Sequence, residues 1–228
     1  MLRNWLKKRG AHYPIQYLRG LQEFYGREFR VAPGVLIPRP ETETVVETAL
    51  AYLRHLTSQR ILAADIGTGS GCIAVTLACE DRRLRVLATD VSTKALRMAR
   101  ENARRLGCPA SCVSFVQADV LPEYAKNLDL IVSNPPYVNL ESRDTVDLSV
   151  RKYEPTQAVF SEDRGLAVYR RIFSRTRQTL KTSGLLLLEL GSGMLEDVVC
   201  SAKANAWHFE ASFPDLAGIQ RCAVFSKD

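Results

Sequence analysis

From residue 60 onward, short apolar runs alternate with amphipathic segments. The apolar runs predict β-strands, and the segments between them carry apolar residues at helical spacing. A strand, a helix and a second strand in succession form a parallel sheet with helices packed on its faces. The pattern therefore predicts an α/β fold with a doubly wound, mostly parallel sheet. The expected strands are 61–66, 84–89, 112–117, 128–133 and 185–190, and the expected helices are 72–80, 93–106, 165–181 and 194–205.

Apolar runs near the two ends of the chain predict hairpins outside this pattern. Near the N-terminus, runs at 23–31 and 35–37 are separated by Pro33-Gly34, which indicates a small β-hairpin. A helix is expected after Pro40, with apolar residues recurring as far as Leu53. Near the C-terminus, runs at 207–213 and 221–225 predict a hairpin that adds an antiparallel strand. We therefore divide the chain into an N-terminal segment with the hairpin, residues 1–37, and a main domain, residues 38–228.

Composition and charge exclude several classes of protein. The 228 residues, 46% of them hydrophobic and 25% charged, suffice for one main domain with a full core. The net charge of +6 comes from arginines spread along the chain, so we expect a solvated basic surface and no direct nucleic-acid partner. No stretch is long enough to span a membrane. The basic first 22 residues resemble a transit peptide but lack its serines.

The cysteines indicate a reducing compartment. Six cysteines are scattered without a CxxC pair, and no secretory apolar region precedes them, so we expect reduced thiols in a cytoplasmic protein. Cys108 and Cys112 have ligand-like spacing, but no histidine lies near them in the sequence. We therefore expect no metal site.

A glycine-rich turn follows the first strand of the alternating pattern. Asp65 precedes it, and Asp90 ends the next expected strand, which is the layout of a nucleoside-binding α/β fold. An acid beside the loop would repel a pyrophosphate and attract an ammonium or sulfonium group, so the ligand that fits best is S-adenosylmethionine. Asp90 is placed to accept hydrogen bonds from a ribose diol. The loop residues expected to contact the ligand are Gly67, Thr68, Gly69, Ser70 and Gly71.

The end of the third expected strand completes the predicted cofactor site. Asp119 is in position to accept a hydrogen bond from an adenine amine, and Val120 to pack against the ring. A carboxylate that only caps a turn is the structural alternative for Asp119.

A second unusual turn, Asn134-Pro135-Pro136-Tyr137, follows the fourth expected strand. Two successive prolines offer carbonyl acceptors and no N–H donors, and the Asn134 side-chain oxygen adds another acceptor. Such a turn suits a guest that arrives as an NH₂ group, either an amide or an exocyclic amine. A stiff turn with a purely structural role is the alternative. The glycine loop and this turn belong to the same carboxyl edge of the sheet, so donor and acceptor would meet there.

The sequence resembles the protein-(glutamine-N5) methyltransferases that modify peptide-chain release factors. The resemblance runs from residue 13 to residue 225 and rests on YLRG at 17–20, VLIPRPETE at 35–43, DIGTGSGCIA at 65–74, NPPY at 134–137, YEP at 153–155, LELG at 188–191 and DLAG at 215–218. It implies a Rossmann-like, class I S-adenosylmethionine-dependent methyltransferase whose acceptor is the glutamine of the GGQ loop of class I release factors.

The resemblance also implies roles for particular residues. Gly67 to Gly71, Asp90, Val120 and Asn134 would contact S-adenosylmethionine, and Asn134 to Tyr137 would hold the substrate glutamine. We expect Asn134 Oδ1 and the Pro135 carbonyl to accept the two amide hydrogens, with Tyr137 against the amide plane and no general base. Arg39 and Glu41 would shape the substrate pocket, with helix capping as their alternative role. We expect the enzyme to act as a monomer.

Three features depart from the family pattern. Only 16 residues precede YLRG, where the family has a helical domain that helps to grip the release factor. Met194 stands where the family often has Gln, and Gln220 stands where it usually has Asp before Arg221. These changes concern the grip on the substrate more than the chemistry.

Two other functions stay open from the sequence alone. Adenine-N6 methylation of DNA or RNA would use the same NPPY turn, with Tyr137 stacked on a flipped base. A non-catalytic subunit that binds S-adenosylmethionine is the third reading, although a scaffold would not need Asp65, Asp90 and the complete NPPY turn.

Overall fold

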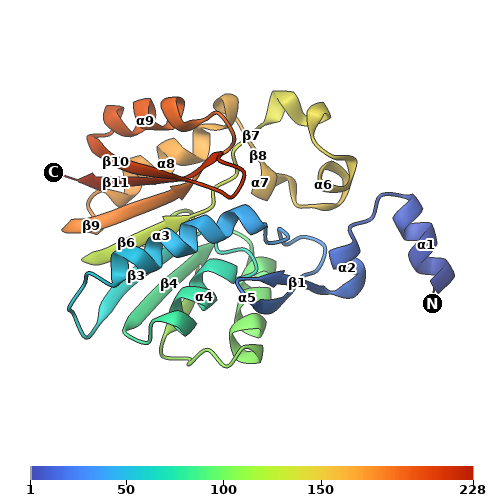
Figure 1. Cartoon of the computed structure of the whole chain (residues 1–228), viewed down its shortest axis with the longest axis horizontal. Helices are drawn as coiled ribbons and strands as arrows, with labels where there is room; N and C mark the ends of the chain where they lie inside the picture. The colour runs from blue at the N-terminus through green and yellow to red at the C-terminus, as the bar shows by residue number, and fades with distance from the viewer. Residues whose placement is uncertain (1, 228) are drawn as a thin grey trace.

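A seven-stranded sheet with strand order β10-β11-β9-β6-β3-β4-β5 forms the centre of the protein (Figure 1). The computed structural model describes residues 2–227, apart from the side chains of Leu2 and Asn4. Strands β3, β4, β5, β6 and β9 pair in parallel, and β11 pairs antiparallel with β9 and β10. The predicted α/β class and the antiparallel C-terminal strand are therefore confirmed. The strands are β3 (Ile61–Ile66), β4 (Leu84–Asp90), β5 (Val113–Gln117), β6 (Leu128–Ser133), β9 (Leu180–Glu189), β10 (Trp207–Pro214) and β11 (Gln220–Lys227).

Helices cover both faces of this sheet. Helices α3 (Glu43–Leu53), α4 (Cys72–Glu80) and α5 (Thr93–Arg105) pack on one face, and α8 (Ala167–Thr176) and α9 (Leu195–Ala204) pack on the other (Figure 1). Successive strand residues point to opposite faces, so each buried strand contributes to two separate cores. Each of the strands β3, β6 and β9 is therefore apolar on both sides, as the continuous apolar runs in the sequence predicted.

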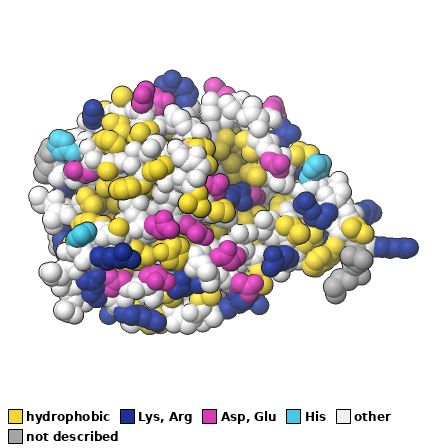
Figure 2. Space-filling view, in the orientation of Figure 1, with side chains coloured by type: hydrophobic (Ala, Val, Ile, Leu, Met, Phe, Trp, Pro, Cys, Tyr) yellow, Lys and Arg dark blue, Asp and Glu magenta, His cyan; other side chains and the backbone are white. Residues whose placement is uncertain are grey.

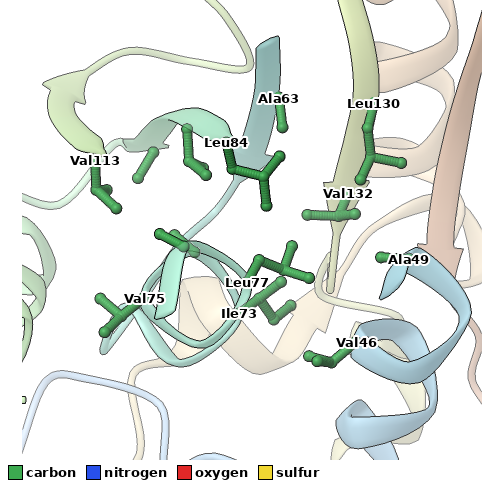
Figure 3. Packing of buried hydrophobic residues seen from close by; sticks show 14 of the residues in the cluster. Val46, Ala49, Ala63, Ile73, Val75, Leu77, Leu84, Val113, Leu130 and Val132 are labelled. Atoms are coloured by element: carbon green, nitrogen blue, oxygen red, sulfur yellow. The ribbon is translucent and has the colours of Figure 1, made fainter. Parts of the chain in front are cut away.

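Figure 3 shows how the first of these cores is filled. Val46 and Ala49 of α3 and Leu77 of α4 point toward Leu130 and Val132 of β6. All five side chains are at most 1% exposed. Burying a side chain of this kind contributes about 1.5–3 kcal/mol, and α3 and α4 are thereby fixed next to the carboxyl end of β6.

Helix α5 begins and ends where its sequence signals predict, whereas α8 ends earlier than expected. The Ser92 hydroxyl accepts a hydrogen bond from Ala95 N at 3.2 Å and caps α5, and Gly107 follows that helix with φ of +68°. The helix expected at 165–181 is shorter, because β9 begins at Leu180. Leu180 pairs with Leu128 of β6, with a register shift before the next pair. This pairing with a strand far away in sequence extends β9 to residues that do not alternate between apolar and polar.

The N-terminal hairpin exists, but its predicted turn is wrong. Strands β1 (Leu21–Phe24) and β2 (Arg27–Arg30) are joined by Tyr25-Gly26, whose φ angles are +50° and +68°. Two central residues with positive φ suit the right-handed twist of a two-residue hairpin. Pro33-Gly34 lies outside both strands, and no strand occupies residues 31–39.

The hairpin is joined closely to the main domain. Asn102 of α5 accepts from Arg30 N at 2.7 Å and donates to Arg30 O at 3.0 Å. Phe24 and Phe29 are fully buried in the same core as α4. The division at residue 37 therefore separates segments that share one core. Before the hairpin lie two helices that the sequence patterns did not predict, α1 (Leu2–Gly10) and α2 (Ile15–Arg19), and Figure 1 shows α1 projecting away from the sheet.

Short elements fill the stretch between β6 and α8. They are β7 (Val138–Asn139), the 3-10 helix η2 (Leu140–Thr145), α6 (Leu148–Tyr153), α7 (Thr156–Val159), β8 (Phe160–Ser161) and the 3-10 helix η3 (Asp163–Gly165). The 3-10 helix η1 (Pro40–Thr42) leads into α3. Between residues 2 and 227, no helix combines the length and the apolarity needed to cross a bilayer.

Candidate functional site

The site lies where the strand order of the sheet reverses. Strand β3 has β4 on one side and β6 on the other, and the chain visits β4 and β5 before it returns to β6. Loops leave β3 and β6 in opposite directions at such a point, which opens a crevice at the carboxyl edge. A cavity of about 390 Å³ lies there, within the range of cofactor pockets. Its lining includes Gly67, Thr68, Gly69, Ser70, Asp90, Asp119, Val120 and Asn134.

The glycine loop is tied to the end of the neighbouring strand. Asp90 Oδ2 accepts from Gly69 N at 2.9 Å, and Asp90 Oδ1 accepts from Ser92 N at 2.8 Å. Gly71 has φ of +83°, and a Cβ there would lie 3.0 Å from the Ala99 side chain, so glycine is needed for the loop to pack on α5. Burial raises the pKa of Asp90. Each carboxylate oxygen keeps a second acceptor position for a ligand.

Asp65 lies beneath the loop rather than in the cavity. It is fully buried, and its Oδ2 accepts from Thr68 Oγ1 at 2.6 Å and from Ala74 N at 3.2 Å. Its Oδ1 has no partner among the described residues, and burial raises its pKa to about 7. The carboxylate is absent from the cavity lining. It supports the loop from behind, and direct attraction of a sulfonium or ammonium group stays a prediction.

The loop after β5 is strained and charged. Val120 has φ of +72°, a region that β-branched residues rarely adopt, and Thr89 Oγ1 donates to its carbonyl at 2.6 Å. The Asp119 carboxylate pairs with Arg175 of α8 at 2.9 Å and with Arg171 at 3.4 Å. Both Asp119 and Val120 line the cavity, and the charge of Asp119 is balanced by the two arginines.

The side-chain amide of Asn134 is fixed by a residue far away in sequence. Asn134 Nδ2 donates to Thr42 Oγ1 at 3.0 Å, and within residues 2–227 no donor is found for Asn134 Oδ1. A second cavity of about 130 Å³ lies on the other side of the NPPY turn. Asn134, Pro136 and Arg39 line both cavities. Asn134 therefore lies in the wall between a large cavity and a smaller one.

Close packing holds Tyr137 at the end of the turn. A Cβ on Gly165 would lie 2.2 Å from the Tyr137 carbonyl oxygen, and one on Gly191 would lie 2.8 Å from the Tyr137 ring. The Tyr137 hydroxyl lies 3.4 Å from Glu189 Oε1. Tyr137 lines the small cavity together with Pro135, and Met194 packs beside both glycines.

Arg39 and Glu41 have different positions. Arg39 Nη2 pairs with the buried Glu154 Oε1 at 2.5 Å, and Glu154 Oε2 accepts from Ile37 N at 3.2 Å. This pair fixes the segment before α3 at the mouth of both cavities. Glu41 lines neither cavity, so its predicted contact with a substrate has no counterpart in the two linings.

Three residues near the turn had no predicted role: Thr42, Glu154 and Glu189. Each is buried, and each contacts a predicted site residue. Glu189 carried one signal in the sequence, since an acid at the carboxyl end of a continuous apolar run is unusual. Thr42 belongs to the VLIPRPETE motif, but that motif does not indicate its partner, which is 92 positions away.

Two further observations concern the surface charge and the side chains that could bind a metal. Figure 2 shows acidic and basic side chains interspersed on the face that carries α3. No group of three or more His, Cys, Asp and Glu side chains suited to a metal occurs in the described part of the chain.

Comparison with known proteins identifies the family. A model of the methyltransferase small domain matches residues 43–151, which run from α3 into α6. A release factor glutamine methyltransferase of Koribacter versatilis is 42% identical over 94% of this chain and 75% of its own length. One of Moorella thermoacetica is 44% identical over 95% of this chain and 76% of its own length.

The chain belongs to the release factor glutamine methyltransferase family. Among solved structures, the release factor-specific protein-(glutamine-N5) methyltransferase of Alicyclobacillus acidocaldarius matches at a TM-score of 0.50 and 28% identity, over 88% of this chain and 99% of that one. A methyltransferase of Pyrococcus furiosus, 18% identical over 90% of each chain, matches at 0.61 and shares the fold. The methyltransferase fold predicted from the motifs is confirmed.

Proposed function

We propose that this enzyme transfers a methyl group from S-adenosylmethionine to the N5 amide of the GGQ glutamine in class I peptide-chain release factors. The observation that carries the proposal is the orientation of Asn134. Its amide NH₂ faces Thr42, so its oxygen is left as an acceptor in the wall between the two cavities. Family membership supports this choice of substrate.

The large cavity fits S-adenosylmethionine. The glycine loop brings backbone close to the ligand space, Asp90 keeps acceptor positions for a ribose diol, and Val120 offers an apolar surface for a ring. When bound, this cofactor supplies a methyl group activated by its positively charged sulfur. The proposed cofactor contacts are Gly67, Thr68, Gly69, Ser70, Asp90, Asp119, Val120 and Asn134, with Asp65 and Gly71, which do not line the cavity, acting through the loop.

The NPPY turn compensates for the weak nucleophilicity of an amide. The nitrogen lone pair is shared with the carbonyl, a conjugation reflected in a rotation barrier of about 18–20 kcal/mol. Asn134 Oδ1 and the Pro135 carbonyl can accept the two amide hydrogens and hold the nitrogen toward the large cavity. Positioning of this kind contributes roughly 7–11 kcal/mol when reacting groups are held in near-attack geometry.

The small cavity supports a glutamine acceptor over a flipped base. Its volume is about 130 Å³, and its lining is mostly aliphatic, with Val138, Val146, Val150 and Val159 around Tyr137. A glutamine side chain has an apolar stem and one amide, which matches a cavity lined by several valines and by Asn134. Arg39 is proposed to shape the entrance through its pair with Glu154.

Mass spectrometry of a purified release factor tests the proposal. After incubation with the enzyme and S-adenosylmethionine, the GGQ peptide should gain one methyl group on its glutamine, and a factor with that glutamine replaced should gain none. Methyl transfer to DNA or RNA adenine with no change in the release factor would favour the adenine-N6 alternative. Cofactor binding without transfer to any of these would favour a non-catalytic subunit.

A further inference from the structure

One wall of the small cavity comes from a helix that has no core of its own. Val146, which precedes α6, and Val150 of α6 line the cavity. Both are half-buried, and none of residues 140–153 is buried. A segment with few buried contacts opens easily. The contacts that α6 makes with the rest of the protein therefore decide whether this wall is in place when a substrate enters.

A chain of three tyrosine rings joins α6 to the N-terminal part of the protein. The Tyr153 hydroxyl, at the end of α6, donates to the Ala11 carbonyl at 2.8 Å. The Tyr153 and Tyr13 rings meet edge to face, with their centroids 4.9 Å apart. The Tyr13 ring lies 6.0 Å from the ring of Tyr17, whose hydroxyl donates to the Val35 carbonyl at 2.7 Å. Helix α6 is thereby connected to α2 and to the segment before α3.

A buried ion pair holds the residue that follows α6. Glu154 is 7% exposed. One of its oxygens pairs with Arg39 at 2.5 Å, and the other accepts from Ile37 N at 3.2 Å. A further link, between Arg151 of α6 and Asp144 of η2, is an exposed pair of the kind that contributes little to stability. The C-terminal end of α6 is therefore its main attachment.

These contacts bring together three motifs that have no direct part in the proposed reaction. The motifs are YLRG at 17–20, VLIPRPETE at 35–43 and YEP at 153–155. The hydrogen bonds of this region span 18, 117 and 142 positions in the sequence. Local structure does not require bonds of such range. What they have in common is that they lead to the end of α6, and so to the wall of the small cavity.

We propose that Tyr13, Tyr17 and Tyr153 are positioning residues that hold α6 as the wall of the glutamine cavity. The three tyrosines line neither cavity. Val150 lies three residues before Tyr153, on the same face of the helix, so a displacement of the Tyr153 ring moves Val150 with it. Without the ring contacts, α6 would move outward and the cavity would become wider than a glutamine stem. This inference rests on the proposed function, since it assigns the small cavity to the substrate glutamine.

Steady-state kinetics with the release factor as the varied substrate test the inference. Tyr13→Ala and Tyr153→Ala should each raise KM about tenfold, as expected when a glutamine stem loses the burial of one or two CH₂ groups. In both variants kcat should stay within about twofold, because the wall contacts the stem alike in the ground state and in the transition state. Tyr153→Phe keeps the ring and loses one exposed hydrogen bond, so its KM should remain within about threefold of the original value.

Two further substitutions separate positioning from other roles. Tyr52→Ala is the matched control, because Tyr52 is a half-buried tyrosine of α3 whose hydroxyl donates to the Ser183 carbonyl in the first half of β9, at 2.8 Å. This variant should lose stability with no change in KM. Val150→Ala should raise KM by itself, and Tyr153→Ala added to it should raise KM by no more than about twofold again, since both act on one wall. Direct contact of Tyr153 with the release factor would make the two effects multiply.

Particular kinetic results would overturn the proposal. They are an unchanged KM in Tyr13→Ala and Tyr153→Ala, a loss of kcat in place of a rise in KM, an equal rise in KM in Tyr52→Ala, or effects of Tyr153→Ala and Val150→Ala that multiply. Failure of the proposed function has a different signature, because the unsubstituted enzyme would then leave the release factor unmethylated.

Hydrogen exchange still decides the inference in that case. The Arg151 and Glu154 amides close turns at the end of α6, each with a hydrogen bond of 3.0 Å. Both amides should exchange with solvent faster in Tyr13→Ala and Tyr153→Ala, and at the original rate in Tyr52→Ala. Unchanged exchange in the first two variants would show that the tyrosines do not hold α6.

Discussion

The glycine loop after β3 and the NPPY turn after β6 lie at the same edge of the sheet. The loop is held by residues close to it in the sequence, whereas the turn is held by residues far from it. Asp65 reaches residues 3 and 9 positions away, and Asp90 reaches Gly69 across 21 positions. Asn134 is held from 92 positions away, Tyr137 from 52, and the nearby Arg39–Glu154 pair spans 115. The loop can form with its own βαβ unit, whereas the turn is correct only when the whole domain has assembled. Cofactor binding should therefore survive changes that abolish transfer.

The glycine loop and the NPPY turn are the two halves of the site, for cofactor binding and for methyl transfer. Replacement of Asn134 by Ala should give the largest difference between the effect on transfer and the effect on cofactor binding. The substitution removes the side-chain acceptor for the amide NH₂ and leaves the glycine loop intact. Loss of one preorganised hydrogen-bonding group at a reacting centre costs about 10²–10³-fold in kcat. Calorimetry should show the dissociation constant for S-adenosylmethionine within a few-fold of the original. An equal loss of binding and rate would mean that the two halves are not independent.

Each half of the site has a buried acid next to it. Asp65 lies behind the glycine loop, and Glu189 lies behind the NPPY turn. Burial raises the pKa of both Asp65 and Glu189 to about 7. Each carboxyl binds its proton more tightly in the folded state than in the unfolded state. The stabilisation that this tighter binding gives is complete at pH values below the unfolded-state pKa, and it is lost as the pH rises through the folded-state pKa of about 7. Relative to the unsubstituted protein, Asp65→Asn should raise the free energy of unfolding above pH 7 by up to about 4 kcal/mol, and Glu189→Gln by up to about 3 kcal/mol.

Urea unfolding at pH 5 and pH 8 measures this effect. The difference between each variant and the original protein should be larger at pH 8, whereas the functional costs should differ, with weaker cofactor binding in Asp65→Asn and lower kcat in Glu189→Gln. A difference that is the same at both pH values would show that the acids do not titrate in this range. The titratable groups that act on Glu189 are Glu41, Cys72, Tyr137, Tyr169, Arg221 and Cys222.

A pair of glycine substitutions tests how tightly the turn is enclosed. Gly165 and Gly107 both have positive φ, but a Cβ on Gly165 would meet the Tyr137 carbonyl at 2.2 Å, and a Cβ on Gly107 would meet nothing within 4 Å. Gly107→Ala should cost about 1 kcal/mol of stability from the backbone conformation alone. Gly165→Ala should cost about 2 kcal/mol more from overpacking and should lower kcat. If chemical denaturation showed equal losses of stability in Gly165→Ala and Gly107→Ala, the tight packing around Tyr137 would be contradicted.

The same difference in contact range explains what could be predicted from the sequence. The sheet, the glycine loop and Asp90 follow from local periodicity and spacing, because one βαβ unit contains them. Pro33 and Gly34 are strong turn formers and predict the hairpin turn at that point, whereas the structure has the turn at Tyr25-Gly26, where both φ angles are positive. Local composition alone does not separate these two turns, and the packing of Phe24 and Phe29 into the core fixes the register.

The support for Asn134 could not be predicted in this way. Thr42 lies in a stretch whose acids indicate the start of a helix, and nothing near it in sequence points to β6. Glu189 reads as the polar end of a strand. Only the order of β3, β6 and β9 in the sheet brings Thr42, Asn134 and Glu189 to one place.

Substitution of Asp90 by Asn should have the smallest effect on activity. It should weaken cofactor binding and leave the transfer step unchanged. Asp90 holds the loop through Gly69 N, and an asparagine oxygen can still accept one of its two backbone bonds. Loss of the charge and of one acceptor should weaken S-adenosylmethionine binding about tenfold, as expected for a hydrogen bond to a charged group. Saturating cofactor should restore kcat, because the NPPY turn is not touched. Asp81→Asn, at the remote end of α4, is the matched control and should leave the dissociation constant unchanged. A kcat that stays low at saturating cofactor would show that Asp90 also positions the acceptor, and the separation between the two halves would then fail at this residue.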